Sequence, residues 1–221
     1  MPPLLFIVMS GFCWIGTYIL LVKRGFQDKS YGMPLVAFSV NIAWETTFSL
    51  VYPIGVNSPA RIIIFVWVIL DALIVVTFFR YGYKYFEERW TRVQFYAVGI
   101  FSLSCAFAFY LMAPPFLLGF PFFNGSMFQV ASFLAYAADN IVVSVLFVNM
   151  FWQRRSIEGQ SFYIGLLKWI GTLLVAVWYL LENNYAFIWL IIVGIEVFDI
   201  LYVKLIYDAL VKLGINPWRR F

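Results

Sequence analysis

Long runs of apolar residues, separated by short polar connections, dominate the hydrophobic pattern of this chain. A helix that crosses about 30 Å of hydrocarbon needs roughly 20 apolar residues, and the short alternating segments of a transmembrane barrel do not occur. The pattern therefore predicts an all-α integral membrane protein, a bundle of seven transmembrane helices. The predicted helices cover residues 3–22, 33–53, 60–79, 92–112, 125–152, 161–181 and 185–207.

The connections between these helices are too short to hold a soluble module. Residues 1–221 are therefore predicted to form a single seven-helix transmembrane domain. Pro114, Pro115, Pro121 and Gly125 are expected to shape the link between the fourth and fifth helices, because proline and glycine favour turns.

Basic residues are concentrated in alternate connections, twelve on one side of the predicted bundle against Arg61 alone on the other. The twelve are Lys23, Arg24, Lys29, Arg80, Lys84, Arg89, Arg92, Arg154, Arg155, Lys212, Arg219 and Arg220. Because cytoplasmic loops carry the positive excess, we predict an outside N-terminus and a cytoplasmic C-terminus. The membrane is expected to be the bacterial plasma membrane, or the endoplasmic reticulum membrane if the chain is fungal.

Composition strengthens the membrane assignment and removes several kinds of site. Only 12% of the residues are charged, against about 25% in soluble domains. The net charge of +4 follows from the loop asymmetry, so no nucleic-acid partner is expected. The chain has no histidine and two separated cysteines, Cys13 and Cys105. This argues against zinc and haem sites and against a structural disulfide, and we predict no metal and no cofactor.

Five acidic residues fall inside the predicted helices. They are Glu45, Asp71, Asp139, Glu196 and Asp199. Each ionisable group at bilayer depth costs at least about 2.5–3.5 kcal/mol on insertion scales, so these residues are the candidates for a functional site. Lys168 and Lys204 lie nearer the predicted cytoplasmic ends, from which a lysine can extend to the headgroups.

A weak similarity between the two halves accompanies these acids. Leu70-Asp71-Ala72-Leu73 in the third predicted helix resembles Phe198-Asp199-Ile200-Leu201 in the seventh. Helices one to three and five to seven would run in the same direction, with the fourth between them. This arrangement suggests a parallel three-plus-one-plus-three repeat, although two apolar segments can also resemble each other by chance.

Three neighbouring segments carry a more specific pattern. They are the loop Asp28-Lys29-Ser30-Tyr31-Gly32-Met33-Pro34-Leu35, the helical Asn41-Ile42-Ala43-Trp44-Glu45 and the helix end Tyr52-Pro53. Together they resemble the membrane-bound terpene cyclases of meroterpenoid and indole-terpenoid biosynthesis, which include the fungal pyripyropene- and paxilline-type enzymes and bacterial relatives that act on prenylated indoles. Asp199-Ile200-Leu201-Tyr202 is similar to the Asp-x-x-Tyr of that family's last helix.

The resemblance implies a seven-helix enzyme in which two acids are essential, and these carry over to Glu45 and Asp199. It implies a prenylated aromatic or indole small molecule as substrate, converted in secondary metabolism by an isomerase- or lyase-type reaction. Asn41, Trp44 and Tyr202 are expected in the substrate pocket. Asp71, Asp139 and Glu196 are further pocket candidates without an assigned role.

The residue types fit this chemistry independently of the resemblance. Burial in a water-poor cavity disfavours the charged form of a carboxyl group, and a protonated carboxyl can donate its proton to a terminal alkene or an epoxide. The carbocations that follow are stabilised by aromatic faces and protected by the exclusion of water. The motifs Asp-Asp-x-x-Asp and Asp-x-Asp-Asp are absent. We therefore predict a metal-free cyclisation in which Glu45 is the general acid, Asn41 orients it, and Asp199 tunes it or protonates in its place.

Two other classes share parts of this pattern. The small seven-helix sugar transporters (SWEET) and Pro-Gln-loop transporters share the topology and the possible repeat, but they use helix prolines that the first, fifth and sixth predicted helices lack. A retinal protein would need a lysine such as Lys204 deep in the last helix, whereas Lys204 lies near the predicted cytoplasmic edge.

Overall fold

The computed structural model describes residues 3–55, 59–182 and 186–221, and all its regular elements are helical within these ranges. The main helices are α1 (Pro3–Gln27), α2 (Leu35–Thr46), α3 (Pro59–Tyr81), α4 (Arg92–Leu117), α5 (Met127–Leu134), α6 (Ile141–Arg154), α7 (Phe162–Glu182) and α8 (Ala186–Lys212). There are two π-helical turns in the described ranges. The turn η1 (Thr47–Val51) continues α2, and the turn η4 (Ala135–Asn140) joins α5 to α6. Short 3₁₀ turns are η2 (Gly82–Tyr85), η3 (Pro121–Phe123) and η5 (Pro217–Arg219).

Six of the helical segments in the described ranges are long and apolar enough to cross a membrane. One of them is the continuous helix Met127–Arg154, built from α5, η4 and α6. The second predicted helix is shorter than expected, since α2 and η1 together run only from Leu35 to Val51. An all-helical membrane protein is therefore confirmed. The seven-helix count and the orientation stay predictions.

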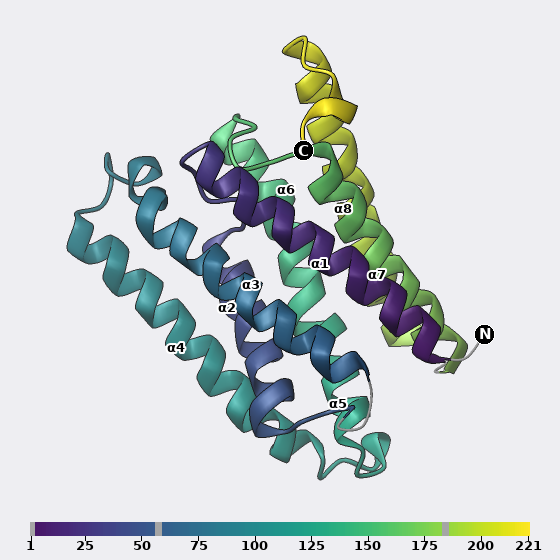
Figure 1. Ribbon diagram of the computed structural model, residues 1–221. Helices are drawn as coiled ribbons and strands as arrows, with labels where there is room; N and C mark the ends of the chain where they lie inside the picture. The colour runs from purple at the N-terminus through teal and green to yellow at the C-terminus, as the bar shows by residue number, and fades with distance from the viewer. Residues whose placement is uncertain (1–2, 56–58, 183–185) are drawn as a thin grey trace.

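The bundle is arranged around α1 and α2. Helix α1 packs between α3 and α7, and α2 packs against α3, α4 and α6. Helix α4 lies at the edge of the bundle, beside α2 (Figure 1). Helix α2 also packs against η4, and the acids of α2, α3 and η4, which are Glu45, Asp71 and Asp139, are all buried.

The helix contacts of the two halves follow the same pattern. Helix α3 packs on α1 and α2, and α8 packs in the same way on the α5–α6 helix and α7. Between the halves, α1 contacts α7 and α2 contacts α6. These are the contacts that two related three-helix units would make, with α4 outside both. The internal repeat itself stays a prediction.

One expectation about the links is wrong. Pro114 and Pro115 lie inside α4, which continues to Leu117, so they do not form the connection to α5. A helical proline removes the hydrogen bond to the carbonyl four residues earlier. For Pro115 that carbonyl is Leu111 O, and it accepts a hydrogen bond of 3.1 Å from Tyr52 Oη instead. The tyrosine of the Tyr52-Pro53 helix end therefore compensates a proline in a neighbouring helix.

Three buried apolar clusters meet at one place in the bundle. The largest contains Trp14 and Tyr18 of α1, Trp44 packs against a second, and Tyr136 and Trp178 belong to a third. All five of these aromatic residues line a single cavity, so the packing of the core leaves an aromatic chamber at its junction.

Candidate active site

Glu45 lies at the centre of a buried polar network. Its side chain is 1% exposed, and its Oε1 accepts hydrogen bonds from Tyr18 Oη at 2.8 Å and from Asn41 Nδ2 at 3.1 Å. The other oxygen, Oε2, has no hydrogen-bond partner among the described residues. One oxygen of this carboxyl is therefore held in place while the other is available to carry a proton.

Asn41 ties three helices together through one amide group. Its Nδ2 donates to Tyr18 Oη at 2.5 Å and to Asp71 Oδ2 at 2.7 Å, in addition to Glu45. An amide has two hydrogens, so the longer contact to Glu45 shares a hydrogen with another. Because Tyr18 Oη accepts from Asn41, its own hydrogen is directed to Glu45. The predicted orientation of Glu45 by Asn41 is thus matched by a direct hydrogen bond, reinforced by Tyr18.

A cavity of about 140 Å³ opens beside this network. It is lined by parts of α1, α2, α3, α5, η4 and α7, and Glu45, Asn41, Trp44 and Asp139 are among its lining residues. Its aromatic residues in the described ranges are Trp14, Tyr18, Trp44, Trp67, Phe128, Tyr136 and Trp178. The combination of an acid and a mainly apolar wall with several aromatic rings is that of a pocket for an apolar, cation-forming ligand.

Hydrogen bonds fix two of the tryptophans that line this cavity. Trp44 Nε1 donates to Ala131 O at 3.0 Å, and Trp67 Nε1 donates to Gly11 O at 3.3 Å. Since these polar groups are bound to backbone, the indole rings are left to present carbon surfaces to the cavity. Such surfaces attract a carbocation without supplying a nucleophile.

Asp71 and Asp139 both belong to the surroundings of Glu45. Asp71 is fully buried, is bonded to Asn41 and does not line the cavity. Asp139 is 4% exposed and lines it directly from η4. Both are close enough to Glu45 for their charges to interact. Three carboxyl groups in one apolar interior cannot all be ionised without strong repulsion, so the cluster favours the retention of a proton.

Asp199 lies in a separate polar centre. Its Oδ1 is 2.5 Å from Lys168 Nζ, which also donates to Ser144 Oγ at 2.8 Å. Asp199 does not line the cavity, so the structure does not bring it together with Glu45. The idea that Lys168 extends to the headgroups is wrong, because its side chain is 1% exposed and ion-paired. Lys204 is exposed and paired with Asp208.

The two polar centres are built in the same way. In the first, Asn41 of α2 donates to a hydroxyl of α1 and to the aspartate of α3. In the second, Lys168 of α7 donates to a hydroxyl of α6 and to the aspartate of α8. In both, the middle helix of a three-helix unit supplies the nitrogen donor. Asp71 and Asp199 thus occupy corresponding places.

Two other pocket candidates lie away from the cavity. Tyr202 is buried, packs its ring edge-on against Phe147 and donates a hydrogen bond to Gln160 Oε1. Glu196 accepts a 2.8 Å hydrogen bond from Trp169 Nε1 on α7. Neither residue lines the cavity, and both contribute to helix packing.

The Tyr31-Gly32 loop belongs to a clamp at the end of the bundle where α1 ends. The Arg154 guanidinium lies near the rings of both Tyr31 and Tyr85, 4.4 and 4.0 Å from their centroids. It also donates to Tyr31 O at 2.8 Å and to Ser30 Oγ at 2.5 Å. A Cβ on Gly32 would lie 2.6 Å from the Gly159 carbonyl oxygen, so glycine is required for the approach of the two loops. The loop motif is therefore structural.

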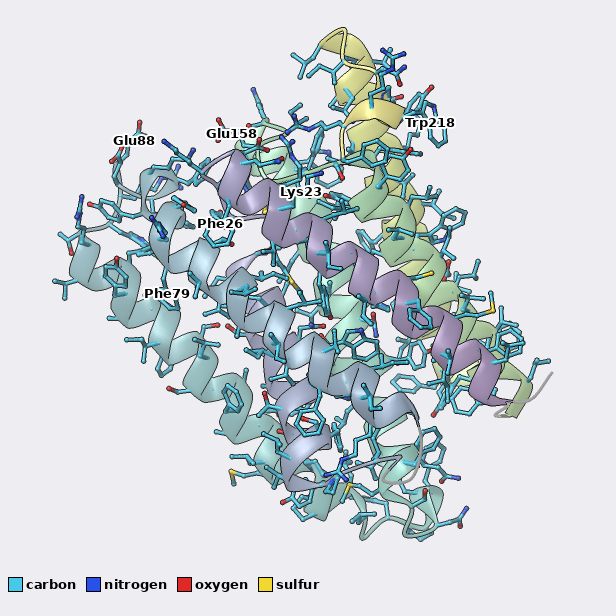
Figure 2. All side chains as sticks on the ribbon, viewed as in Figure 1. Lys23, Phe26, Phe79, Glu88, Glu158 and Trp218 are labelled. Atoms are coloured by element: carbon cyan, nitrogen blue, oxygen red, sulfur yellow. The ribbon has the colours of Figure 1, made fainter. Side chains whose placement is uncertain are left out.

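Glu158 extends this clamp to the surface. It accepts hydrogen bonds from Tyr85 Oη and, at 2.9 Å, from Lys84 Nζ. The hydrogen bond from Tyr85 is the main reason that the pKa of Glu158 is lowered from its ordinary value. Glu88, Glu158 and Trp218 are labelled at this end of the bundle in Figure 2.

Comparison with known proteins identifies the family. The sequence model of the Pyr4-like transmembrane terpene cyclases matches residues 3–209, nearly the whole chain. The chain belongs to this family. No solved structure matches it.

Curated relatives agree with this assignment. The Pyr4-family terpene cyclase mfmH of Annulohypoxylon moriforme is 33% identical over 178 residues, covering 78% of this chain and 69% of the relative. Terpene cyclase macJ of Penicillium terrestre is 25% identical over 171 residues, covering 77% and 64%. Terpene cyclase andB of Emericella variicolor is 26% identical over 169 residues, covering 74% and 66%. The chain therefore spans less than two thirds of the length of macJ and andB.

Membership of the Pyr4-like family confirms the resemblance and decides against the transporter and retinal interpretations. The chain is an integral, multi-pass membrane protein of a terpene cyclase family. The expected bacterial plasma membrane finds no support, because these relatives come from fungi.

Sequence reasoning missed three contributors to the polar centres of this Pyr4-like protein. Nothing in the sequence distinguishes Tyr18 among the fourteen tyrosines or Ser144 among the other small polar residues, and the pattern places Lys168 near the headgroups. Only Lys168 carried a usable signal. A lysine seven residues into a helix that begins at Phe162 is too far from the helix end to reach water easily, so an internal partner is required.

Proposed function

We propose that this protein is a membrane-bound terpene cyclase that protonates the terminal alkene or epoxide of a prenylated, farnesyl-type small molecule. A metal-free cyclisation through carbocations then follows. The observation that carries the proposal is the Glu45 carboxyl, which lines an aromatic cavity with Oε1 bonded and Oε2 without a partner in the described part of the chain.

Glu45 would deliver the proton from Oε2. Tyr18 and Asn41 hold Oε1, so the carboxyl is oriented before the substrate arrives, and orientation of this kind is a large part of general acid catalysis. The repulsion of Asp71 and Asp139 favours the protonated form of the cluster. After transfer, Tyr18 and Asn41 donate to the carboxylate and stabilise it.

The cavity wall would guide the cation. Each aromatic face contributes about 0.5–2 kcal/mol of attraction to a cation, and the tryptophans of α1, α2, α3 and α7 surround the cavity from different sides. The lining of the cavity is mainly apolar, which disfavours water beside the cation and so limits its early capture. Proton transfer to carbon or to an epoxide oxygen needs no metal or organic cofactor.

Asp199 would act through Lys168 and not on the substrate. It neutralises a buried ammonium that lies 5.8 Å from the Trp14 ring, a part of the cavity wall. We therefore assign Asp199 a positioning role in place of the role of a second proton donor.

Family membership supports a substrate class and a compartment for this proposal. The matched relatives are named terpene cyclases of fungi, which supports a prenylated aromatic or indole substrate, a role in meroterpenoid biosynthesis and a location in the endoplasmic reticulum membrane. The reaction would be an isomerisation or lyase-type conversion of a linear chain into rings.

The test of this proposal is the Glu45→Gln enzyme. Membranes are incubated with farnesylated and geranylgeranylated aromatic acceptors, with and without a terminal epoxide, and products are identified by mass spectrometry and NMR. The wild type should form cyclised isomers, and Glu45→Gln should lose at least about 100-fold in rate while remaining folded. Glu196→Gln, which removes an acid outside the cavity, is the matched control. Wild-type rates in folded Glu45→Gln would refute the assignment.

A further inference from the structure

Asp139 is the second carboxylic acid that lines the cavity, counted over the described residues. It lies in the π-helical turn η4, in which each backbone hydrogen bond spans one residue more than in an α-helix. Such turns are often found at functional sites. Its side chain is 4% exposed, and its Oδ1 has no hydrogen-bond partner among the described residues. A buried, unpartnered carboxyl directed at a cavity is costly and calls for a function.

The charges around Asp139 differ from those around Glu45. The charged groups that act most strongly on Glu45 are two other carboxyls, Asp71 and Asp139. Asp139 experiences Asp71 too, but it also experiences the ammonium of Lys168. A nearby cation favours the ionised form of a carboxyl, and a nearby carboxylate disfavours it. Asp139 is therefore the cavity acid on which a nearby cation acts, whereas Glu45 is held by hydrogen bonds from Tyr18 and Asn41.

The other polar groups on the cavity wall are less suited to take a proton. Asn140 Nδ2 donates to Ala135 O at 2.8 Å, and Ser132 Oγ donates to Phe128 O at 2.9 Å. An amide or a hydroxyl is in any case a far weaker base than a carboxylate. Asp71 and Asp199 are carboxylates, but they are bonded to Asn41 and Lys168 and do not line the cavity.

We propose that Asp139 is the base that removes the last proton from the cyclised carbocation. The inference rests on the proposed function, because it needs a cation formed in this cavity. The Asp139 carboxylate takes a proton from a carbon next to the cationic centre, and the electrons of that C–H bond form the new C=C bond. Asp139 gains a proton in place of the one that Glu45 gave at the start. Return of a proton from Asp139 to Glu45 completes the cycle, and the net reaction is an isomerisation.

The experiment compares product distributions of purified Asp139→Asn and wild type on one farnesylated aromatic acceptor that the wild type cyclises. The amide introduced by this substitution would keep the shape of the side chain but could not accept the proton. We expect cyclisation to continue, with the wild-type alkene reduced about 100-fold and cyclised alcohols, formed by water capture of the cation, in its place. Asp139→Glu, which restores a carboxylate, should return alkene product.

Two results would overturn the proposal. One is the wild-type alkene at the wild-type rate from Asp139→Asn, and the other is the loss of all cyclised product from a folded Asp139→Asn enzyme. Should Asp139→Asn fail to fold, Asp139→Leu gives the same comparison without a buried polar group. A parallel reaction with Glu45→Gln tests the two proposals separately. If Glu45→Gln still cyclises the substrate, Glu45 is not the acid and the proposed function fails. If Glu45→Gln is inactive, an unchanged product from Asp139→Asn contradicts only the role of Asp139.

Discussion

The ammonium of Lys168 and the carboxylate of Asp199 lie 2.5 Å apart, and their side chains are only 1% and 2% exposed. Removal of one partner from a buried ion pair leaves an uncompensated charge and typically costs about 3–5 kcal/mol, whereas removal of both is far better tolerated. This difference distinguishes a positioning role of Asp199 from a role in proton donation.

We predict that Lys168→Met and Asp199→Asn each lower stability by about 3–5 kcal/mol and reduce cyclisation, and that the double variant recovers much of both. Thermal unfolding in detergent and product formation are measured on all three. Lys204→Met, which breaks the exposed pair with Asp208, serves as the control and should change stability by about 0–1 kcal/mol. If the double variant is stable but as inactive as Asp199→Asn, the loss of activity does not come from the unpaired lysine. That result would show that Asp199 is itself a proton donor.

Tyr18→Phe removes the hydroxyl that bridges Asn41 and Glu45. We expect the turnover rate to fall about tenfold, with little change in KM, because the acid loses an orienting bond worth about 1–2 kcal/mol. Tyr110→Phe is the matched control, since the buried Tyr110 hydroxyl has no hydrogen-bond partner within the described residues. The hypothesis fails if the two variants have the same rate.

Arg154→Lys retains the charge in the loop clamp but not the planar, forked donor that contacts the rings of Tyr31 and Tyr85. We predict a loss of about 2–3 kcal/mol in unfolding free energy, from weakened stacking and lost charged hydrogen bonds. Arg155→Lys, at the exposed neighbouring position, should be neutral. Because the clamp is remote from the cavity, product identity should not change, and an altered product would contradict its structural role.

Glu158 should make stability depend on pH in one direction. Its pKa is lowered from an ordinary value of 4.5, mainly by the Tyr85 hydrogen bond. A lowered pKa in the folded state means that the folded protein binds the proton less readily than the unfolded chain. The contribution is therefore present above about pH 4.5 and is lost as the pH falls through the folded-state value.

The measurement is the midpoint of thermal unfolding between pH 7 and pH 3, compared between wild type and Glu158→Gln. The difference between the two should shrink at low pH. The shift will be small, since 47% of the Glu158 side chain is exposed and solvent screens the interaction. A difference that grows toward low pH would contradict the assignment.

The lengths of the apolar runs predicted most of the helices well. The reason is that backbone groups in lipid must be hydrogen-bonded within the protein, which leaves few alternatives to a helix. The second helix is shorter than its apolar run, and Pro114 and Pro115 did not end the fourth. The latter outcome depends on Tyr52, whose hydroxyl satisfies Leu111 O from another helix. No local pattern can reveal such a contact, because it exists only after packing.

The sequence predicted individual residues of the candidate site, but it did not predict which of them lie together. Glu45, Asn41, Trp44 and Asp139 meet at the cavity, and Glu45 and Asn41 are one helical turn apart, which sequence spacing reveals directly. Asp199 was predicted to act together with Glu45 only because of the family resemblance. Its pairing with Lys168 depends on which faces of α7 and α8 meet, and apolar sequence on all sides of a helix does not specify that face.

The π-helical turn Ala135–Asn140 has a consequence for how such a gene can change. An α-helix turns about 100° per residue, and a π-turn accommodates one additional residue without displacing the helices on either side. Deletion of a single codon in this stretch would restore regular helix and swing Asp139 away from the cavity, with α5 and α6 left in place. One in-frame deletion could thus alter how the reaction ends while sparing the scaffold.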